Sequence, residues 1–299
     1  MFVRMLSLQT GAALLLSLIP SCTMSSSQPG GHVTRRRRPA DGVATLIGAG
    51  DIAGCDPKYQ DEATAALIDS VPGVVFTTGD NAYPNGKSAD FACYTSSWGR
   101  FKSRTRPVPG NHDYHTDGGA GYFRAFGPLA GPAGRGYYSY DAATWHIIAL
   151  NSEIDTTEQL AWLRADLAAH PYPCILAYWH RPLFTSGVVH HGSKRVQPYF
   201  AALERAGAEI VLNGHNHQYE RFLPQTAAGV PDERGIVEFV VGTGGAELYG
   251  FGTAQPNSAV RDDRDHGVLE LQLHPGWYHY EFVTVTKRDS VDAGVGTCH

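Results

Sequence analysis

Five short motifs hold the side chains of this sequence that are best suited to chemistry. In chain order they are Gly50-Asp51, Gly79-Asp80-Asn81-Ala82-Tyr83, Gly110-Asn111-His112-Asp113, Trp179-His180 and Gly214-His215-Asn216-His217. A single Gly-Asp is usually a tight turn, and a single His is usually a hydrogen-bonded structural residue. Two imidazoles that flank one residue after a glycine, by contrast, often bind a metal. The recurrence of carboxylate, amide and imidazole donors therefore predicts a metal centre built from five segments.

Each motif follows or ends a short apolar segment, and these segments predict the strands that position the donors. They span Thr45–Gly50, Gly73–Gly79, Pro107–Gly110, Cys174–Trp179 and Ile210–Gly214. Apolar runs of this length, bounded by turn residues, are typical of buried strands. Helical stretches are expected between them at Asp61–Ser70, Thr156–His170 and Lys194–Ala206. Alternating strands and helices indicate a largely parallel sheet, in which ligands gather beyond the carboxyl ends of the strands.

The helix expected at Thr156–His170 has the clearest pattern of the three. Thr156 and Gln159 have the spacing of a capping box. Leucines recur on one face of this helix at Leu160, Leu163 and Leu167. That face is expected to pack against the core.

The C-terminal part of the sequence has a different pattern. Gly235–Val241 and Gly267–Val285 are rich in β-branched and aromatic residues, and Pro275-Gly276 forms a turn signal within the second segment. We interpret both segments as antiparallel strands of a second sheet. Tyr137–Asp141 and Trp145–Leu150 have the pattern of a further hairpin. The expected fold class is α/β (α+β), with two packed sheets and helices outside them.

The five motifs together resemble the metallophosphoesterase (calcineurin-like) superfamily over residues 44–285, and most of all its compact purple acid phosphatases. This resemblance implies a four-layer αββα sandwich of two mixed sheets, with a dinuclear metal site at the carboxyl ends of the strands. Carried over residue by residue, it implies a first metal held by Asp51, Asp80, Tyr83 and His217. It implies a second metal held by Asp80, Asn111, His180 and His215, with Asp80 as the bridge.

One substitution selects the purple acid branch of the superfamily. The wider superfamily has Asp-x-His in its first motif, but Ala53 occupies the position of that His and cannot bind a metal. Purple acid phosphatases instead carry a Tyr three residues after the bridging Asp, where this sequence has Tyr83. Ala53 also replaces a usual Gly, and Ala177 a usual Val, although neither change removes a ligand. A phenolate favours Fe(III), whereas the second site suits divalent Fe, Zn or Mn.

The resemblance implies an acid-phosphatase-type phosphomonoesterase, in which a metal-bound hydroxide attacks phosphorus in line. His112, His190 and His191 are the candidates to protonate the leaving group, although a solvated loop is the alternative for the last two. Asp113 is expected to orient His112 through a hydrogen bond. Residues without a motif context are expected to be structural: His115, His146, His266 and His279. Two rival functions stay open, namely a phosphodiesterase or nucleotide hydrolase on the same site and a non-catalytic protein that binds phosphate or metal.

Composition indicates an ordinary globular protein. The chain has 299 residues, of which 42% are hydrophobic and 18% charged, with a net charge of −5. One domain over residues 43–299 is the simplest division of such a chain. The dense basic run Arg35–Arg38 lies outside it, so no basic face indicates nucleic-acid binding. The expected partner is a small phosphate ester.

The N-terminal residues 1–21 have the features of a signal peptide: Arg4, a short apolar stretch at Gly11–Ile19, and small residues after it. Ile19-Pro20-Ser21-Cys22 resembles a bacterial lipobox, so lipid attachment at Cys22 and simple secretion are both open. Residues 22–42 lack apolar periodicity and are interpreted as a disordered linker. The protein is therefore expected to be secreted or extracytoplasmic, with lipid anchoring as one alternative.

The remaining cysteines suit an oxidising compartment, because without Cys22 their number is even. We predict a Cys55–Cys93 disulfide, since each cysteine follows a strand end that carries a predicted ligand. We predict that Cys174–Cys298 ties the C-terminal tail to a central strand.

Overall fold

The computed structural model describes residues 42–286 and 291–299. The predicted signal peptide, Cys22 and all of the predicted linker except residue 42 lie outside these residues. Within the two described ranges, no helix has the length and apolar composition that a membrane span requires.

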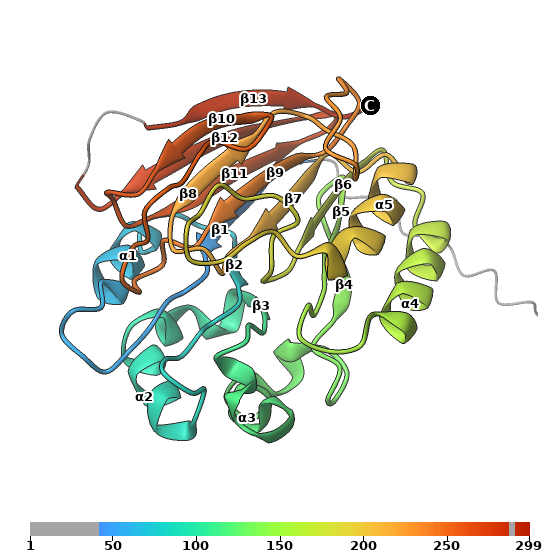
Figure 1. Ribbon diagram of the computed structural model, residues 1–299. Coiled ribbons are helices and arrows are strands. Elements are labelled where there is room, and N and C mark those ends of the chain that lie inside the picture. Colours follow the sequence, from blue (N-terminus) through green and yellow to red (C-terminus); the bar gives the residue numbers. More distant parts are fainter. Residues whose placement is uncertain (1–41, 287–290) are drawn as a thin grey trace, which may run out of the picture. The chain divides into compact units, whose positions relative to one another are not determined.

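The strands of the described residues form two sheets (Figure 1). The first has the strand order β13-β12-β11-β1-β2-β3 and the second has the order β10-β8-β9-β7-β6-β5-β4. The strands of the first sheet are β1 (Ala44–Ala49), β2 (Val74–Thr78), β3 (Thr105–Val108), β11 (Gly267–His274), β12 (Trp277–Thr284) and β13 (Ala293–Thr297). Those of the second are β4 (Tyr138–Ala142), β5 (Trp145–Ala149), β6 (Cys174–Tyr178), β7 (Ile210–Asn213), β8 (Tyr219–Phe222), β9 (Val237–Val241) and β10 (Ser258–Asp262). Both sheets are mixed, as expected.

The parallel strands are divided between the two sheets. β1, β2 and β3 are parallel neighbours in the first sheet. β5, β6, β7 and β9 are parallel neighbours in the second. β4 and β5 form the predicted hairpin. The five motif-bearing strands therefore do not share one sheet, and the predicted ligands reach a common edge only because the sheets face each other.

The placement of the C-terminal strands corrects the sequence interpretation. β11 and β12 form a hairpin that extends the first sheet, with β11 antiparallel to β1 and Leu271 opposite Leu46. β9 does lie in the second sheet, but it pairs in parallel with β7 and antiparallel only with β8. Side-chain alternation identifies the buried face of a strand and not its neighbours. Leu269, Leu271 and Leu273 are buried in the same core as Leu46, which explains the observed pairing.

Helices pack on the two sheets, and the second sheet separates two apolar cores. The α-helices are α1 (Asp61–Ile68), α2 (Ser88–Ser96), α3 (Ala120–Phe126), α4 (Thr156–Ala169) and α5 (Gln197–Arg205). Short 3-10 segments are η1 (Trp98–Arg104), η2 (Asp113–His115), η3 (Asp117–Gly119), η4 (Gly127–Ala130) and η5 (Lys194–Val196). α4 and α5 lie side by side on the second sheet (Figure 1). Ile147 faces the core between the sheets, and Ile148 faces the core under α4 and α5.

The start of α4 differs from the prediction, whereas its buried face agrees with it. The N-cap is Asp155, whose carboxylate accepts the N–H of Thr157 at 2.8 Å, so the Thr156 capping box is wrong. Gln159 is buried instead, and it binds the main chain of Asn151 and the hydroxyl of Tyr199. The predicted leucines do pack against the core under the helix: Leu160, Leu163 and Leu167. The helix is therefore still capped locally, one residue earlier than predicted, and Gln159 instead satisfies buried polar groups.

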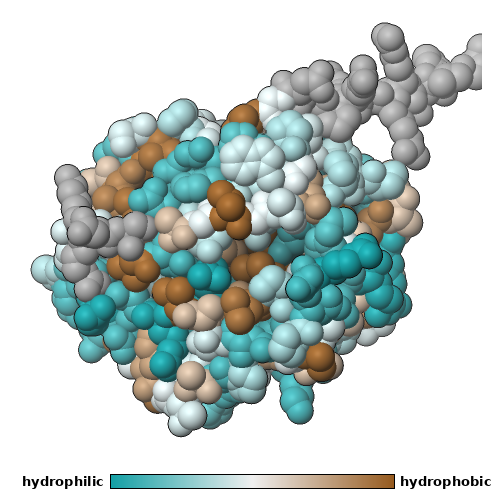
Figure 2. All heavy atoms as spheres, turned by 90° about the horizontal axis from the view of Figure 1, so that it is seen from above, coloured by the Kyte–Doolittle hydropathy of each residue, from teal (hydrophilic) through white to brown (hydrophobic). Residues whose placement is uncertain are grey.

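Both predicted disulfides are present. Cys55–Cys93 joins the loop after β1 to α2. Cys174–Cys298 joins the first residue of β6 to the residue after β13, and so links the second sheet to the first. On the face shown in Figure 2, hydrophobic residues form small separate groups among hydrophilic ones.

Candidate metal centre

The seven predicted ligands follow the carboxyl ends of β1, β2, β3, β6 and β7. Main-chain pairing continues beyond the ends of β1 and β2. The Asp51 N–H donates to the Gly79 carbonyl at 3.0 Å, and the Tyr83 N–H donates to the Ala53 carbonyl at 2.7 Å. The sheets are joined at this edge because the His215 N–H donates to the Asp51 carboxylate at 2.8 Å. These contacts bring the ends of strands from both sheets to one place.

The backbone at this edge is unusual, and its glycines allow a close approach. Asp51, Asp80 and His215 have φ values of 60°, 47° and 72°. Such left-handed conformations in non-glycine residues are uncommon and cluster at functional sites. A Cβ on Gly110 would lie 2.2 Å from Oδ1 of Asp80, and one on Gly79 would lie 2.7 Å from the His180 ring. A larger residue at either position would displace a predicted ligand.

The first predicted ligand set surrounds the Tyr83 hydroxyl. Its oxygen lies 3.0 Å from Oδ1 of Asp51, 3.3 Å from Oδ2 of Asp80 and 3.0 Å from Nε2 of His217. The His217 Nδ1 donates to the Glu247 carbonyl at 2.7 Å, so its Nε2 has a free lone pair in the neutral ring. Tyr83 has a single proton for three acceptors. Ligands about 2.1 Å from one ion and at right angles are about 3 Å apart, so this donor set fits a cation.

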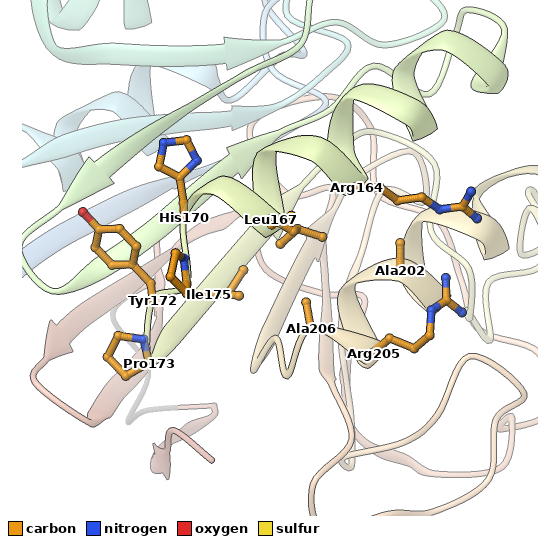
Figure 3. A pocket seen from close by; sticks show the side chains of 11 residues that line it. Arg164, Leu167, His170, Tyr172, Pro173, Ile175, Ala202, Arg205 and Ala206 are labelled. Carbon is orange, nitrogen blue, oxygen red and sulfur yellow. The ribbon is translucent and has the colours of Figure 1, made fainter. Parts of the chain in front are cut away.

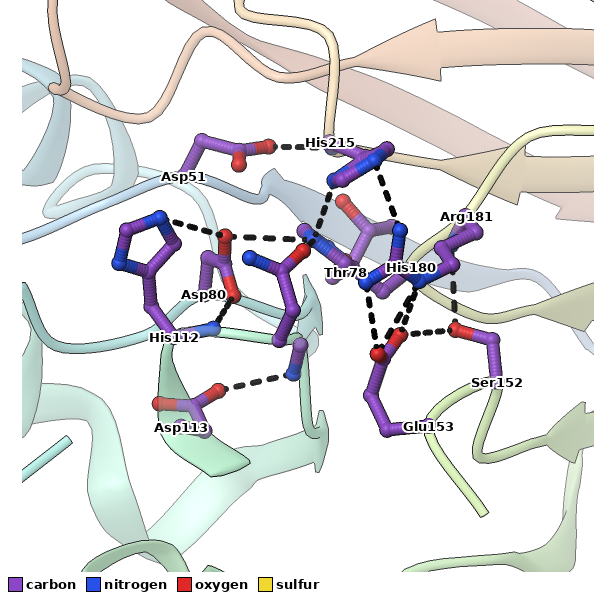
Figure 4. Close-up of polar contacts among 12 residues, drawn as sticks. Asp51, Thr78, Asp80, His112, Asp113, Ser152, Glu153, His180, Arg181 and His215 are labelled. Carbon is purple, nitrogen blue, oxygen red and sulfur yellow. Dashed lines mark hydrogen bonds and ion pairs between the residues drawn. The ribbon is translucent and has the colours of Figure 1, made fainter. Parts of the chain in front are cut away.

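The second predicted set surrounds Nε2 of His180 (Figure 4). The His180 Nδ1 donates to the Thr78 carbonyl at 2.8 Å, which leaves Nε2 as an acceptor in the neutral ring. That atom lies 3.2 Å from Oδ2 of Asp80, 3.1 Å from Oδ1 of Asn111 and 3.1 Å from Nδ1 of His215. Oδ2 of Asp80 therefore belongs to both sets, as a bridging ligand requires. The donors in this second set also fit a cation.

Burial and charge explain the protonation of the predicted ligands. Burial, followed by the Asp51 and Asp80 carboxylates, raises the pKa of Tyr83 well above its usual value, so a phenolate here needs a cation. Burial alone would raise the pKa of Asp80, but His180 outweighs it and holds the pKa below its usual range. Burial, then the neighbouring His180 and Arg181, lowers the pKa of His215. Burial alone would lower the pKa of His180, but the Asp80 carboxylate raises it to about 10, so a cation has to displace a proton there, because neutral imidazole is the form that binds metals.

His112 lies beside the metal ligands rather than among them. Its main-chain N–H donates to Oδ1 of Asp80 at 2.7 Å, and its ring Nδ1 donates to the Pro84 carbonyl at 2.7 Å. Its Nε2 lies 4.0 Å from Oδ2 of Asp80, and its side chain is 30% exposed. This position suits a group that meets a substrate.

The expected hydrogen bond from Asp113 to the His112 ring is absent, because Pro84 holds that ring. The Asp113 carboxylate instead accepts the main-chain N–H of Gly110 at 2.9 Å and the side-chain amide of Asn81 at 2.9 Å. It thus fastens the loop after β2 to the loop after β3, which carry Asp80 and Asn111.

The structure separates the two histidines of the loop after β6. His190 stacks on His215, with ring centroids 4.0 Å apart, and its main-chain N–H donates to Asn216. His191 is exposed and lines a different cavity of about 430 Å³ with Phe184 and Lys194. His190 is therefore beside the second ligand set, whereas His191 faces the other cavity.

Three further residues at this centre were missed by the sequence analysis. Arg181 lies with Nη1 3.0 Å from Nε2 of His215 and pairs with the Glu153 carboxylate at 3.0 Å (Figure 4). Tyr249 stacks on His217 with centroids 4.0 Å apart. Adjacency to His180 could have indicated Arg181. Glu153 and Tyr249 lie in loops without any motif.

Comparison with known proteins agrees with this geometry. The sequence model of the calcineurin-like phosphoesterase family matches residues 44–219. Purple acid phosphatase 15 of Arabidopsis thaliana is 30% identical over 223 residues, which cover 60% of this chain and 41% of that protein. The chain thus spans less than half the length of this curated relative.

Solved structures support the fold. Purple acid phosphatase PPD1 from yellow lupin (Lupinus luteus) superposes with a TM-score of 0.72 and 20% identity, over 86% of this chain and 54% of that one. GAP50, the anchor in the inner membrane complex of Plasmodium, superposes with a TM-score of 0.66 and 15% identity, over 86% of this chain and 89% of that one. At these identities the likeness shows the fold alone.

Proposed function

Because the chain belongs to the calcineurin-like phosphoesterase family, we propose that it is a dinuclear-metal phosphatase of the purple acid type that hydrolyses phosphate monoesters. The observation that carries this proposal is the position of the Tyr83 hydroxyl, 3.0 Å from both Asp51 and His217. Ala53, which cannot bind a metal, is paired through its carbonyl with the Tyr83 N–H. Tyr83, the substitute ligand, thus lies beside Ala53, the position where the wider superfamily has its histidine ligand.

The proposed first metal is Fe(III), held by Asp51, Asp80, Tyr83 and His217. The proposed second metal is a divalent ion (Fe, Zn or Mn), held by Asp80, Asn111, His180 and His215. The first set has three oxygen donors and one nitrogen, which favours the harder ion. The second has two of each, which suits a borderline divalent ion.

When bound, the two cations would neutralise the phosphoryl oxygens and activate the attacking water. The chain's own residues then have separate tasks. His112, held by Pro84 and partly exposed, donates a proton to the leaving group. His190 is the second candidate for this role because it stacks on His215, and it is favoured over His191. Arg181 adds a permanent positive charge that attracts the phosphate ester.

We further propose that residues 43–299 form the catalytic domain and that residues 1–21 direct export. The two disulfides are consistent with an oxidising compartment. Lipid attachment at Cys22 and simple secretion remain the two alternatives. Mass analysis of protein isolated from membranes and from medium distinguishes them.

Hydrolysis of p-nitrophenyl phosphate beside bis(p-nitrophenyl) phosphate, together with metal analysis, tests the function. A phosphomonoesterase gives a higher kcat/KM for the monoester with at least two metals per chain. The reverse preference supports a phosphodiesterase. Two bound metals without turnover of either ester support a non-catalytic binding protein, and fewer than two metals contradict the dinuclear centre.

A further inference from the structure

A second group of histidines and carboxylates lies far along the second sheet from the candidate centre. His146 is near the start of β5, whereas the predicted ligands follow the opposite ends of the neighbouring parallel strands. Asp166 is near the C-terminal end of α4, and His170 is the residue after that helix. We call His146, Asp166 and His170, with Asp141 of β4, the α4 cluster.

The geometry of the α4 cluster is that of a potential cation site. Nε2 of His146 lies 2.8 Å from Oδ2 of Asp166. Nδ1 of His170 lies 3.3 Å from Oδ1 of the same carboxylate and 2.9 Å from the main-chain carbonyl of Asp166, so an ion bound at Nδ1 would replace the hydrogen bond to that carbonyl. One ligand atom from each of the three residues lies within 4.8 Å of the other two. Two imidazoles and one carboxylate are the donors that Zn²⁺ prefers at a three-ligand site.

The orientation of His146 repeats a feature of the dinuclear centre. There, the His180 ring has Nδ1 2.8 Å from a fixed carbonyl acceptor and Nε2 3.2 Å from the Asp80 carboxylate. In the α4 cluster, His146 has Nδ1 2.9 Å from Oδ1 of Asp141 and Nε2 beside Asp166. A carboxylate that accepts the distal N–H of a metal-binding histidine fixes its tautomer and raises its basicity. Asp141 is placed to do so.

The three side chains of the proposed site differ in exposure, so that an ion could enter from one side and be held on the other. The side chains of His146 and Asp166 are 1% and 8% exposed, whereas that of His170 is 42% exposed. His170 and Tyr172 lie at one end of a cavity of about 600 Å³, which Leu167, Ile175 and Arg205 also line (Figure 3). The site is thus closed on the β5 side and open to solvent at His170. Water from this cavity can complete the coordination of an ion.

We propose that His146, Asp166 and His170 bind one divalent cation of the Zn²⁺ class, independently of the dinuclear centre and of phosphatase activity. The ion would connect β5 to the C-terminal end of α4. The competing occupant is a proton: burial lowers the pKa of His146, but hydrogen bonds to Asp166 and Asp141 more than offset this and raise it. Zinc occupancy should therefore weaken as the pH falls, because the proton and the ion compete for Nε2.

Zinc content distinguishes the ion from the proton. Full-length wild type, His170→Ala and His279→Ala are loaded with Zn²⁺ at pH 7.5, desalted and analysed. His170 is chosen because its exposed side chain can be removed without a buried cavity, and His279 is a partly exposed control on β12. We expect His170→Ala to hold one Zn²⁺ per chain fewer than wild type and than His279→Ala. Turnover of p-nitrophenyl phosphate should be unchanged in both variants.

A second variant and a thermal measurement complete the test. Asp141→Asn should weaken binding at this site about 10–100-fold, as loss of an outer-sphere carboxylate typically does. Added Zn²⁺ should raise the Tm of wild type more than that of His170→Ala. Equal zinc contents in wild type and His170→Ala would overturn the proposal and leave His146 as a protonated ion-pair residue. If the dinuclear centre instead fails to bind metal, the zinc content of wild type and of all variants should be lower. The difference of one Zn²⁺ per chain between wild type and His170→Ala should remain.

Discussion

The two sheets contribute different chemistry to the candidate metal centre. Loops that leave the first sheet supply its oxygen donors, Asp51, Asp80, Tyr83 and Asn111. Loops that leave the second sheet supply its imidazoles, His180, His215 and His217. The first proposed metal would take three ligands from the first sheet and one from the second. The second proposed metal would take two ligands from each sheet. We therefore expect the metal preference of each position to follow from how many ligands each sheet contributes.

Neither sheet alone holds a complete ligand set. The contacts that join the sheets at this edge include the His215 N–H on the Asp51 carboxylate and the Gly50 N–H on the Val241 carbonyl at 2.9 Å. Both ligand sets are thus complete only when the two sheets pack against each other. Changes on the two sides should damage metals and turnover in distinguishable ways, which the following predictions exploit.

The largest effect is expected from Asp80→Ala, which removes the one donor shared by both ligand sets. Both metals should be lost, and turnover of every ester should fall to background. Metal analysis and p-nitrophenyl phosphate assays measure this. The control is Asp56→Ala, because Asp56 is an exposed carboxylate in the loop after β1. This variant should keep both metals and its turnover. A variant without Asp80 that retains two metals would show that Asp80 is not the bridge.

His112→Ala comes next, because it removes a group from the first-sheet side without removing a ligand. Both metals should stay bound, while alkyl phosphates should be hydrolysed roughly 10²–10⁴-fold more slowly because their leaving group needs a proton. The loss for p-nitrophenyl phosphate should be markedly smaller. His115→Ala is the matched control, since its ring also contacts the Pro84 carbonyl, at 3.2 Å. Equal losses for both esters would move the proton-donor role to His190.

Tyr83→Phe tests the oxygen-rich set alone. Protein isolated with its native metals should absorb visible light through charge transfer from the Tyr83 phenolate to Fe(III). The variant should lose this band and retain less iron, while the second metal remains, because the donors of the second set are unchanged. Absorption spectra and metal analysis measure both effects. A colourless wild type that is fully active with divalent ions alone would contradict the ferric assignment and leave the phosphatase proposal intact.

The strand-end motifs and the resemblance that they carry were sufficient to predict which side chains gather at this edge, because each of them follows an apolar strand within a short loop. The joint occurrence of Ala53 and Tyr83 was recognised from the resemblance to purple acid phosphatases, and the structure adds that the two residues are hydrogen-bonded neighbours beyond the ends of β1 and β2. The sheet assignment of β11 and β12 was not readable, because alternation does not specify a neighbour. Glu153 and Tyr249 were missed because loop conformation, rather than local spacing, brings Glu153 to Arg181 and Tyr249 to His217.

The smallest effect is expected from Arg181→Gln, on the imidazole side. The Arg181 guanidinium contacts His215 and is fixed by Glu153, which in turn accepts a hydrogen bond from Ser152 at 2.8 Å. Its loss removes a positive charge beside the second ligand set without removing a ligand. Because Arg181 is 29% exposed, solvent screens this charge, and the expected rise in KM for phosphate monoesters is only about three- to tenfold.

Arg181→Lys separates charge from geometry at this position. Lysine keeps the charge but loses the planar fork that pairs with Glu153. If charge attracts the ester, Arg181→Lys should restore most of the KM, and the remaining difference from Arg181→Gln should shrink as the salt concentration rises. If Arg181 mainly orients His215, both variants should instead lose the second metal to the same extent. Metal analysis beside KM measurements at two salt concentrations therefore decides whether the second sheet supplies ligands alone or also part of the charge that attracts the ester.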